Sequence, residues 1–339
     1  MPRVSVIVPT HNRRVILQAA LASVDNQTFR DFELIVVDDG SDDGTAEWVK
    51  NPPGIGQTTI PETHLPTPNP NRSTEPRPSG SGRHGGQEAD LQRTTSSPPL
   101  TLLEIPPPGV GAAAARNRAL QIATGEIIAF LDDDDRWLPD YLAKQVAKLD
   151  ACPNAAVAIA GHTEVSASGA ITKPLLEPAY PYPTALARLL AECPIHTLSV
   201  AACRREMFNR IGLFDESLRI VHDLDWYIRL TQAGGKLVFN SEALVEHAIP
   251  GGLVTKHRDW FHEEQSVHRK CAELEPREHE VVDIARQLFF ARTALSNGDI
   301  PFALARAATC LAKGPRVAAS MIAQRLRQRR RSIKMGEAQ

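Results

Sequence analysis

The hydrophobic positions in the first half of the chain follow two periods in turn. Short β-branched runs that are apolar on both faces, such as 4–9 and 32–37, are typical of strands inside a parallel sheet. Segments with apolar residues three and four positions apart, such as 15–24, are typical of helices. The same reading predicts strands at 100–105, 126–131 and 157–160, and helices at 46–49, 112–123 and 139–149. This alternation predicts an α/β fold with a largely parallel, doubly wound sheet.

Capping residues mark where several of these elements begin or end. Ser41 or Asp42 is predicted to cap the helix at 46–49. Gly125 is predicted to end the helix at 112–123 as its C-cap. Pro139 is predicted to open the helix that runs to about residue 149, with Asp140 in its first turn.

The alternation breaks between about residues 52 and 99. This stretch is rich in Pro, Ser, Thr and Gly and holds few apolar residues, so it buries too little surface to fold by itself. We predict a disordered insertion, with an ordered functional lid as the alternative. The sheet pattern with this insertion defines a first domain over 1–255.

A helical C-terminal extension is predicted over 256–339. Residues 281–313 predict two helices joined at 297–299. Their apolar faces predict a hairpin packed on the first domain through Ile284, Leu288, Ala291, Ala294, Phe302, Leu304, Ala305 and Ala308. Residues 316–334 predict a basic helix, with cations at Arg325, Arg327, Arg329, Arg330, Arg331 and Lys334 between Met321, Ile322 and Leu326. This tail either contacts an anionic membrane surface or is a solvated terminal helix.

Composition narrows the classes of function. The 339 residues carry a formal net charge of −2, which gives no reason to expect a nucleic-acid partner. The five cysteines form no C-x-x-C pair, so we expect a reducing compartment rather than a disulfide framework or a zinc site. No apolar run reaches the ~18 residues that a membrane span needs. We therefore expect a cytoplasmic protein, free or peripheral at the inner face of the membrane.

Two acidic clusters directly follow predicted strands, where open α/β sheets bind their ligands. The first cluster contains Asp38 and Asp39, which follow the strand predicted at 32–37. An aspartate there can accept a hydrogen bond from a base or ribose. A capped turn is the alternative. The second cluster runs from Asp132 to Asp135, and Mg²⁺ or Mn²⁺ shared with a diphosphate would neutralise its four carboxylates. A solvated acidic turn is the alternative for it.

A third cluster, His222-Asp223-Leu224-Asp225-Trp226, begins a predicted helix. Asp225 and Arg229 are four residues apart and are expected to form a surface ion pair. Asp223 is either a helix cap or a carboxylate base that faces the site.

Residues 109–114 fit the pattern G-x-G-x-x-A, which invites a dinucleotide reading. We reject that reading because three prolines separate the motif from its strand and no matched ribose-binding acid follows. The start of the helix can still hold a phosphate. Arg116 is a candidate ligand there, with a solvated or ion-paired helix residue as the alternative.

Together these motifs resemble family 2 glycosyltransferases. The matching segments lie at 4–13, 27–29, 32–45, 111–120, 125–135, 137–142, 211–218 and 222–230. Their order and spacing match apart from the insertion, and the resemblance covers roughly residues 3–255. It implies a GT-A-type, Rossmann-like fold, with a mostly parallel mixed sheet flanked by helices and followed by the helical extension.

The resemblance also implies roles for single residues. Pro9 and His11 would line the nucleotide pocket, Asp39 would contact the base or ribose, and Asp133 would lie near the ribose. The D-x-D pair would be Asp132 and Asp134, of which Asp134 is the direct metal ligand. Asp223 occupies the position of the catalytic base. His247 follows a strand-like segment where relatives place a metal-binding or pocket histidine, and a structural histidine is the alternative.

The implied reaction moves one sugar from a nucleoside-diphosphate sugar to a saccharide or lipid-linked acceptor, with inversion and with Mn²⁺ or Mg²⁺. His222 departs from the usual Glu before the base. The Gln-x-x-Arg-Trp signature of processive synthases is absent, which favours single-sugar transfer. A non-catalytic nucleotide-sugar-binding module is the alternative. A phosphohydrolase fits poorly, because Asp135-Arg136 follows where its D-x-D-x-[TV] signature needs other residues.

Overall fold

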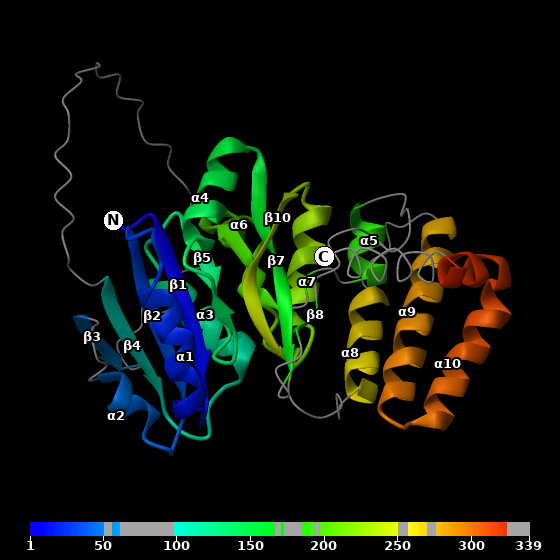
Figure 1. The fold of residues 1–339 in the computed structure, drawn as a ribbon, viewed down its shortest axis with the longest axis horizontal. Coiled ribbons are helices and arrows are strands. Elements are labelled where there is room, and N and C mark those ends of the chain that lie inside the picture. Colours follow the sequence, from blue (N-terminus) through cyan, green and yellow to red (C-terminus); the bar gives the residue numbers. More distant parts are fainter. Residues whose placement is uncertain are drawn as a thin grey trace.

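The computed structural model describes residues 1–50, 56–61, 98–166, 171–172, 185–192, 195, 197–249, 257–269 and 276–323. Within these ranges, a ten-stranded sheet runs in the order β3-β4-β2-β1-β5-β9-β7-β10-β6, with β8 paired to β7. Helices flank the sheet, and a group of helices from the C-terminal part stands beside it (Figure 1). The predicted α/β class is confirmed.

The parallel half of the sheet comes from the N-terminal part of the chain. Its elements are β1 (Val4–Thr10), α1 (Arg14–Asp25), β2 (Phe32–Asp39), α2 (Thr45–Lys50), β4 (Pro99–Ile105), α3 (Ala112–Ile122) and β5 (Ile127–Phe130). Strand β1 pairs in parallel with β2 and β5, and β2 pairs in parallel with β4. Every residue of β1 and β5 is buried, as the two-sided apolar pattern predicts.

The other half makes the sheet mixed. Its elements are β6 (Arg136–Trp137), α4 (Tyr141–Ala151), β7 (Ala155–Ser166), β8 (Ile171–Thr172), α5 (Ala185–Glu192), the 3₁₀ turn η2 (Leu198–Val200), β9 (Ala201–Arg204), α6 (Arg205–Ile211), α7 (His222–Gln232) and β10 (Lys236–Ile249). Strand β9 lies antiparallel between β5 and β7, while β10 runs parallel to β7. The sheet is therefore mixed, and the short strands β6 and β8 also pair antiparallel, with β10 and β7 respectively.

The predicted insertion at about 52–99 contains a strand near its start. Strand β3 (Gly56–Pro61) pairs in parallel with β4, and β4 itself begins at Pro99. The run Thr58-Thr59-Ile60 is β-branched, which favours a strand, but the Pro- and Ser-rich sequence around it hides this short signal. The rest of the predicted insertion, 62–97, lies outside the described residues.

Two predicted caps are also wrong. Neither Ser41 nor Asp42 caps α2; Asp43 accepts a 3.1 Å hydrogen bond from the Thr45 backbone N–H instead. Gly125 is not the C-cap of α3, because that helix ends at Ile122 and its C-cap is Ala123, which is extended. A Cβ at Gly125 would lie 2.5 Å from the backbone nitrogen of Ser5, so this glycine permits the close approach of two backbones.

The C-terminal extension contains α8 (His257–Arg269), α9 (Pro276–Ser296) and α10 (Ile300–Lys313), followed by helical residues 315–323. The predicted hairpin of two helices joined at 297–299 is confirmed. Helix α9 buries Ile284 and Ala294 and contacts α5, α8 and α10. The predicted face of α10 is wrong, since Leu304, Ala305 and Ala308 are exposed and Ala303 and Cys310 are buried instead.

Most of the predicted basic tail, 324–339, lies outside the described residues. Met321, which we expected on its apolar face, is 4% exposed and belongs to the core. Among the described helices, none combines the length and the apolar character that crossing a bilayer requires.

Candidate functional site

The carboxyl ends of β1, β2 and β5 lie side by side at one edge of the sheet. Because β1 pairs in parallel with both neighbours, His11, Asp39 and the cluster from Asp132 to Asp135 meet at this edge. Pro9 lies within β1 opposite Val37 and is buried. His11 Nδ1 lies 2.7 Å from the backbone oxygen of Asp39. The sequence therefore brings both acidic clusters to one place, where such sheets bind ligands.

The Asp39 carboxylate holds the glycine-rich loop in place. Its two oxygens accept hydrogen bonds of 2.7 and 2.8 Å from the backbone N–H groups of Val110 and Gly111. Gly109 has a φ of +85°, and a Cβ there would lie 2.3 Å from the backbone oxygen of Asp39. Close packing on Asp39 thus explains Gly109, while Gly111 is explained by its φ of +91° at the start of α3.

Arg13 neutralises two of the four clustered carboxylates. Its Nη1 donates to Asp133 Oδ1 at 2.8 Å and to Asp134 Oδ2 at 2.9 Å. Asp133 also accepts a 2.8 Å hydrogen bond from Thr10 and is buried. Burial and the charges of the neighbouring carboxylates outweigh Arg13 and raise the pKa of Asp134. Asp134 therefore lies in an excess of negative charge that a further cation would relieve.

Arg116 connects the aspartate cluster to the start of α7. Its Nη2 is ion-paired with Asp132, and its Nη1 lies 3.2 Å from His222 Nε2. Burial and the charge of Arg116 lower the pKa of His222 to about 3, so the imidazole is neutral. Burial opposes the ionisation of Asp132, but Arg116 and a hydrogen bond from Thr197 outweigh it and lower the pKa of this carboxyl. The ion-paired alternative for Arg116 is thus observed.

Asp223 follows His222 in the first turn of α7. Its Oδ1 accepts a 2.7 Å hydrogen bond from the backbone N–H of Leu224, so the carboxylate is held at the helix N-terminus. Burial nevertheless raises the pKa of Asp223 to about 6. A carboxylate with this pKa is ionised at neutral pH and is still basic enough to accept a proton.

His247 contacts the fourth aspartate of the cluster rather than the D-x-D pair. Its Nδ1 lies 2.9 Å from Asp135 Oδ1, and Asp135 Oδ2 accepts a 2.9 Å hydrogen bond from Thr197. Asp135 is fully buried. Burial opposes protonation of His247, but the hydrogen bond and charge of Asp135 raise its pKa. Within the described ranges no three His, Cys, Asp or Glu residues form a metal cage, although the charges of Asp132 and Asp134 also raise the pKa of His247.

Helix α8 of the extension holds the loop that precedes α7. The Glu263 carboxylate accepts hydrogen bonds of 2.7, 2.6 and 2.9 Å from the backbone N–H groups of Arg219, Ile220 and Val221. These three residues lead directly into His222 and Asp223. The extension thereby fixes the position of the helix start that carries the candidate base.

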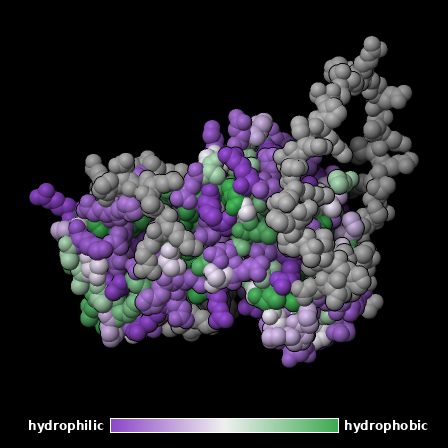
Figure 2. Space-filling model, turned by 180° about the vertical axis from the view of Figure 1, so that it is seen from behind, coloured by the Kyte–Doolittle hydropathy of each residue, from purple (hydrophilic) through white to green (hydrophobic). Residues whose placement is uncertain are grey.

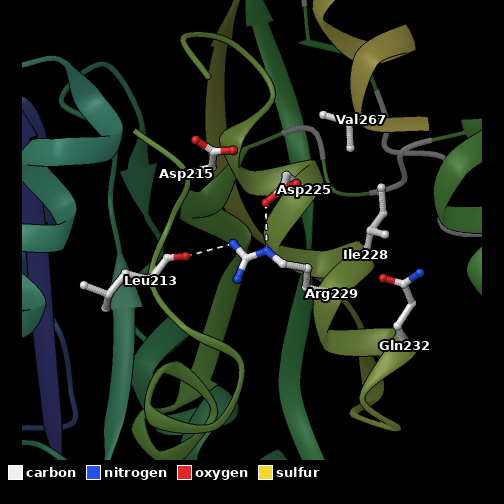
Figure 3. A pocket seen from close by; sticks show the side chains of 7 residues that line it. All are labelled: Leu213, Asp215, Asp225, Ile228, Arg229, Gln232 and Val267. Carbon is white, nitrogen blue, oxygen red and sulfur yellow. Dashed lines mark hydrogen bonds and ion pairs between the residues drawn. The ribbon is translucent and has the colours of Figure 1, made fainter. Parts of the chain in front are cut away.

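A separate pocket lies on another face of α7, toward α8 (Figure 3). Its lining includes Asp225 and Arg229, whose 2.8 Å ion pair confirms the predicted i, i+4 contact. Arg229 also donates to the carbonyl oxygens of Ile211 and Leu213, both at 2.8 Å. The Arg229 guanidinium thus holds the loop around residue 212 against α7.

Several residues of the site escaped the sequence reasoning. Thr10, Arg13, Thr197 and Glu263 have no distinctive spacing relative to the acidic clusters, although Thr10 and Arg13 lie within the matched segment 4–13. Thr197 is far away in sequence and reaches both Asp132 and Asp135 through its hydroxyl. Only the three-dimensional structure could identify it, because an isolated threonine carries no sequence signal.

Comparison with known proteins places these features in a family context. Residues 5–52 and 95–212 match the family described as Glycosyl transferase family 2. The two matched segments flank the predicted insertion and include His11, Asp39, Arg116 and the whole aspartate cluster.

Two relatives of known activity share part of the sequence. A GalNAc(5)-diNAcBac-PP-undecaprenol beta-1,3-glucosyltransferase of Campylobacter jejuni is 31% identical over 148 residues, which are 44% of this chain and 35% of the relative. The UDP-Glc:alpha-D-GlcNAc-diphosphoundecaprenol beta-1,3-glucosyltransferase WfgD of Escherichia coli is 27% identical over 67% of this chain and 68% of the relative. The chain thus matches only about a third of the length of the first.

Two solved structures share the fold. One is S. aureus TarS 1–349 in complex with UDP-GlcNAc, with a TM-score of 0.57, 19% identity, and coverage of 98% of this chain and 92% of that one. The other is the mannosyltransferase PcManGT from Pyrobaculum calidifontis with GDP-Man and Mn²⁺, with a TM-score of 0.55, 23% identity, and coverage of 95% and 79%. The predicted GT-A fold is confirmed by this likeness.

Proposed function

Because the chain belongs to glycosyl transferase family 2, we propose that it moves a single sugar from a nucleoside-diphosphate sugar to an acceptor hydroxyl, with inversion at the anomeric carbon. The observation that carries this proposal is the connection of Asp223 to the aspartate edge. Arg116 pairs with Asp132 and contacts His222, the residue before Asp223, and the charges of Arg116 and Asp132 both act on the Asp223 carboxyl.

The donor nucleotide is proposed to bind across the ends of β1, β2 and β5. Pro9 and His11 would line its pocket, and Asp39 and Asp133 would face the base and ribose. Asp39 is already fixed by Val110 and Gly111, so it would offer its oxygens without reorganisation. Arg116 would keep its ion pair with Asp132 and contribute positive charge near the diphosphate from α3.

A divalent cation, Mn²⁺ or Mg²⁺, fits the chemistry of the aspartate edge. Asp134 supplies hard oxygen ligands, which these ions prefer, and the neighbouring carboxylates that raise its pKa would be neutralised by a cation. Asp132 would supply the second carboxylate of the D-x-D pair. When bound, such an ion stabilises negative charge on the leaving diphosphate. His247 is better assigned to holding Asp135, with which it is hydrogen-bonded.

Asp223 is proposed to act as the general base. Its carboxylate would take the proton of the acceptor hydroxyl while that oxygen forms a bond to C1 of the sugar. The bond between C1 and the diphosphate oxygen breaks in the same displacement, and the nucleoside diphosphate leaves with the electron pair. A raised pKa of about 6 suits this role, because the group stays ionised at neutral pH.

The acceptor is proposed to be a saccharide carried on a lipid diphosphate. Both relatives described above act on undecaprenyl-diphosphate-linked sugars, as their names state. An enzyme with such an acceptor would work in the cytoplasm at the inner face of the membrane, in peripheral contact with it.

A transfer assay tests this proposal. Radiolabelled UDP- and GDP-sugars are incubated with undecaprenyl-diphosphate-linked saccharides and Mn²⁺, and lipid-extractable label is measured for the wild type and Asp223→Asn. We expect label in the lipid phase with one donor and at least a thousandfold slower transfer by the variant. Binding of a donor without any transfer by the wild type would instead support a non-catalytic nucleotide-sugar-binding module.

A further inference from the structure

The outer face of α10 is apolar along its whole length. The residues of Ile300 to Ala312 that the structure leaves exposed are Ile300, Pro301, Leu304, Ala305, Ala308, Leu311 and Ala312, and none of them is polar. Leu304 is 65% exposed and Leu311 is 61% exposed. A surface helix normally turns charged residues to water, so this face has the character of a contact surface.

The cations of α10 are turned away from this face. Arg306 lies over the rings of Phe261 and Phe302 and bonds Gln287, while Lys313 is ion-paired with Asp283 of α9. Arg306 therefore packs toward the neighbouring helices and Lys313, although 55% exposed, pairs with α9 at the end of the helix, while the leucines lie on the outer side. This arrangement is the reverse of what solvent exposure alone would favour.

We propose that the outer face of α10 binds the surface of an anionic lipid bilayer, with its leucines inserted among the lipid chains. The argument rests on this face and on charge, and it does not depend on the transfer activity.

The sequence that follows α10 favours a lipid surface over other occupants. After Lys313, the sequence contains one acidic residue, Glu337, and seven basic residues: Arg316, Arg325, Arg327, Arg329, Arg330, Arg331 and Lys334. An apolar helix face followed in the sequence by a strongly cationic segment matches a surface of acyl chains under anionic headgroups. A second copy of the chain carries the same cationic sequence, so like charges oppose its approach while an anionic membrane attracts it.

The position of the face is compatible with this contact. Helix α10 forms the outer edge of the molecule, at the opposite end from α1 and β1 (Figure 1). The view from behind shows hydrophobic surface along the same edge (Figure 2). Docking there would leave the aspartate edge of the sheet uncovered.

Vesicle sedimentation with the full-length protein tests the proposal. The bound fraction is measured with phosphatidylcholine vesicles with and without 30 mol% phosphatidylglycerol, for the wild type and for Leu304→Glu combined with Leu311→Glu. We expect binding only to the anionic vesicles, weakened at least tenfold by the double substitution and by 0.5 M NaCl. Val15→Glu is the matched control, because Val15 is a 75% exposed aliphatic residue at the far end of the molecule. It should bind like the wild type.

Three results would overturn the proposal. The wild type could remain in the supernatant with anionic vesicles, or the double variant could bind them as well as the wild type. Light scattering could show a wild-type dimer that the double substitution converts to monomer, which would make a second copy the occupant. Unchanged melting temperatures would establish that the substitutions act on the surface, since both leucines are exposed.

Discussion

Arg116 joins the two halves of the candidate site. It is 5% exposed, and it contacts an aspartate that follows β5 and a histidine that begins α7. Removing one partner of a buried ion pair leaves the other charge without compensation, which is costlier than losing the pair as a whole. The consequences for stability can therefore be measured without any knowledge of the substrate.

Arg116→Ala should destabilise the fold by about 3 kcal/mol, because it leaves the partly buried Asp132 carboxylate without its cation. Urea unfolding at pH 7.5 measures this change. Arg210→Ala is the control, since Arg210 is exposed and donates to the Ala233 carbonyl oxygen; it should cost less than about 1 kcal/mol. Equal losses in the two variants would show that Arg116 does not hold a buried network.

The activity should depend on the ionisation of Asp223. Burial raises the pKa of its carboxyl from 3.8 to about 6, and the basic form is the ionised one. As pH falls through this value, the base is lost and kcat/KM should decrease about tenfold per pH unit. The profile should be flat from pH 7 to pH 8. A rate that stays constant from pH 5 to pH 8 would contradict the assignment of Asp223.

Sequence alone identified acidic residues and missed their partners. Asp39, Asp132 and Asp223 could be found because they follow strands or begin a helix in a recognisable order. Thr197 and Glu263 could not, because each reaches the site through the fold of distant segments. The sequence also left open whether Arg116 is a ligand or an ion-paired residue. The structure was needed to find its ion pair with Asp132.

At the scale of elements, α8 controls where α7 begins. Three backbone N–H groups before His222 are bound by one side chain, Glu263, from outside the matched family region. A helix start that is held in this way keeps the candidate base in a fixed place. The helical extension thus contributes to the site as well as to the core.

Glu263→Ala should lower kcat about tenfold or more, because it frees the loop that positions Asp223. Donor affinity should be unchanged, since the donor site lies at the ends of β1, β2 and β5. Initial rates and equilibrium donor binding measure the two effects separately, and Glu263→Gln should recover part of kcat because its amide oxygen still accepts hydrogen bonds.

Arg258→Gln serves as the control for this prediction. Arg258 is also on α8, but it bonds Asp299 at the start of α10 instead of the loop before α7. Its kcat should stay close to that of the wild type. If both variants lost kcat to the same extent, α8 would act through general stability alone.

The element boundaries show where sequence patterns succeed. The bounds of long apolar strands such as β1 and β2 were predicted to within two residues, because burial on both faces produces a continuous apolar run in the sequence. The face of α10 was predicted wrongly, because Arg306 and Lys313 on its polar side pair with Gln287 and Asp283 of α9 instead of facing only solvent. Only contact with α9 decides that Ala303 and Cys310 point inward.

At the scale of the whole molecule, one sheet edge gathers groups from distant parts of the chain. Parallel pairing of β1 with β2 and β5 aligns their carboxyl ends, and Arg116 adds the start of α7. The order of these strands could be expected from the alternation of elements, while the antiparallel β9 between β5 and β7 could not. The molecule thus presents an acidic edge for a donor and an apolar face on α10 at its far end.

Equilibrium titration of nucleotide sugars tests the central claim most directly. UDP-, GDP- and dTDP-sugars are titrated calorimetrically into the wild type and Asp134→Ala, with Mn²⁺, with Mg²⁺ and with EDTA. We expect one nucleotide class to bind in the presence of metal, with at least tenfold loss of affinity in EDTA and in the variant. If no nucleotide sugar bound the wild type under any of these conditions, the donor site at the aspartate edge, and with it the proposed function, would be contradicted.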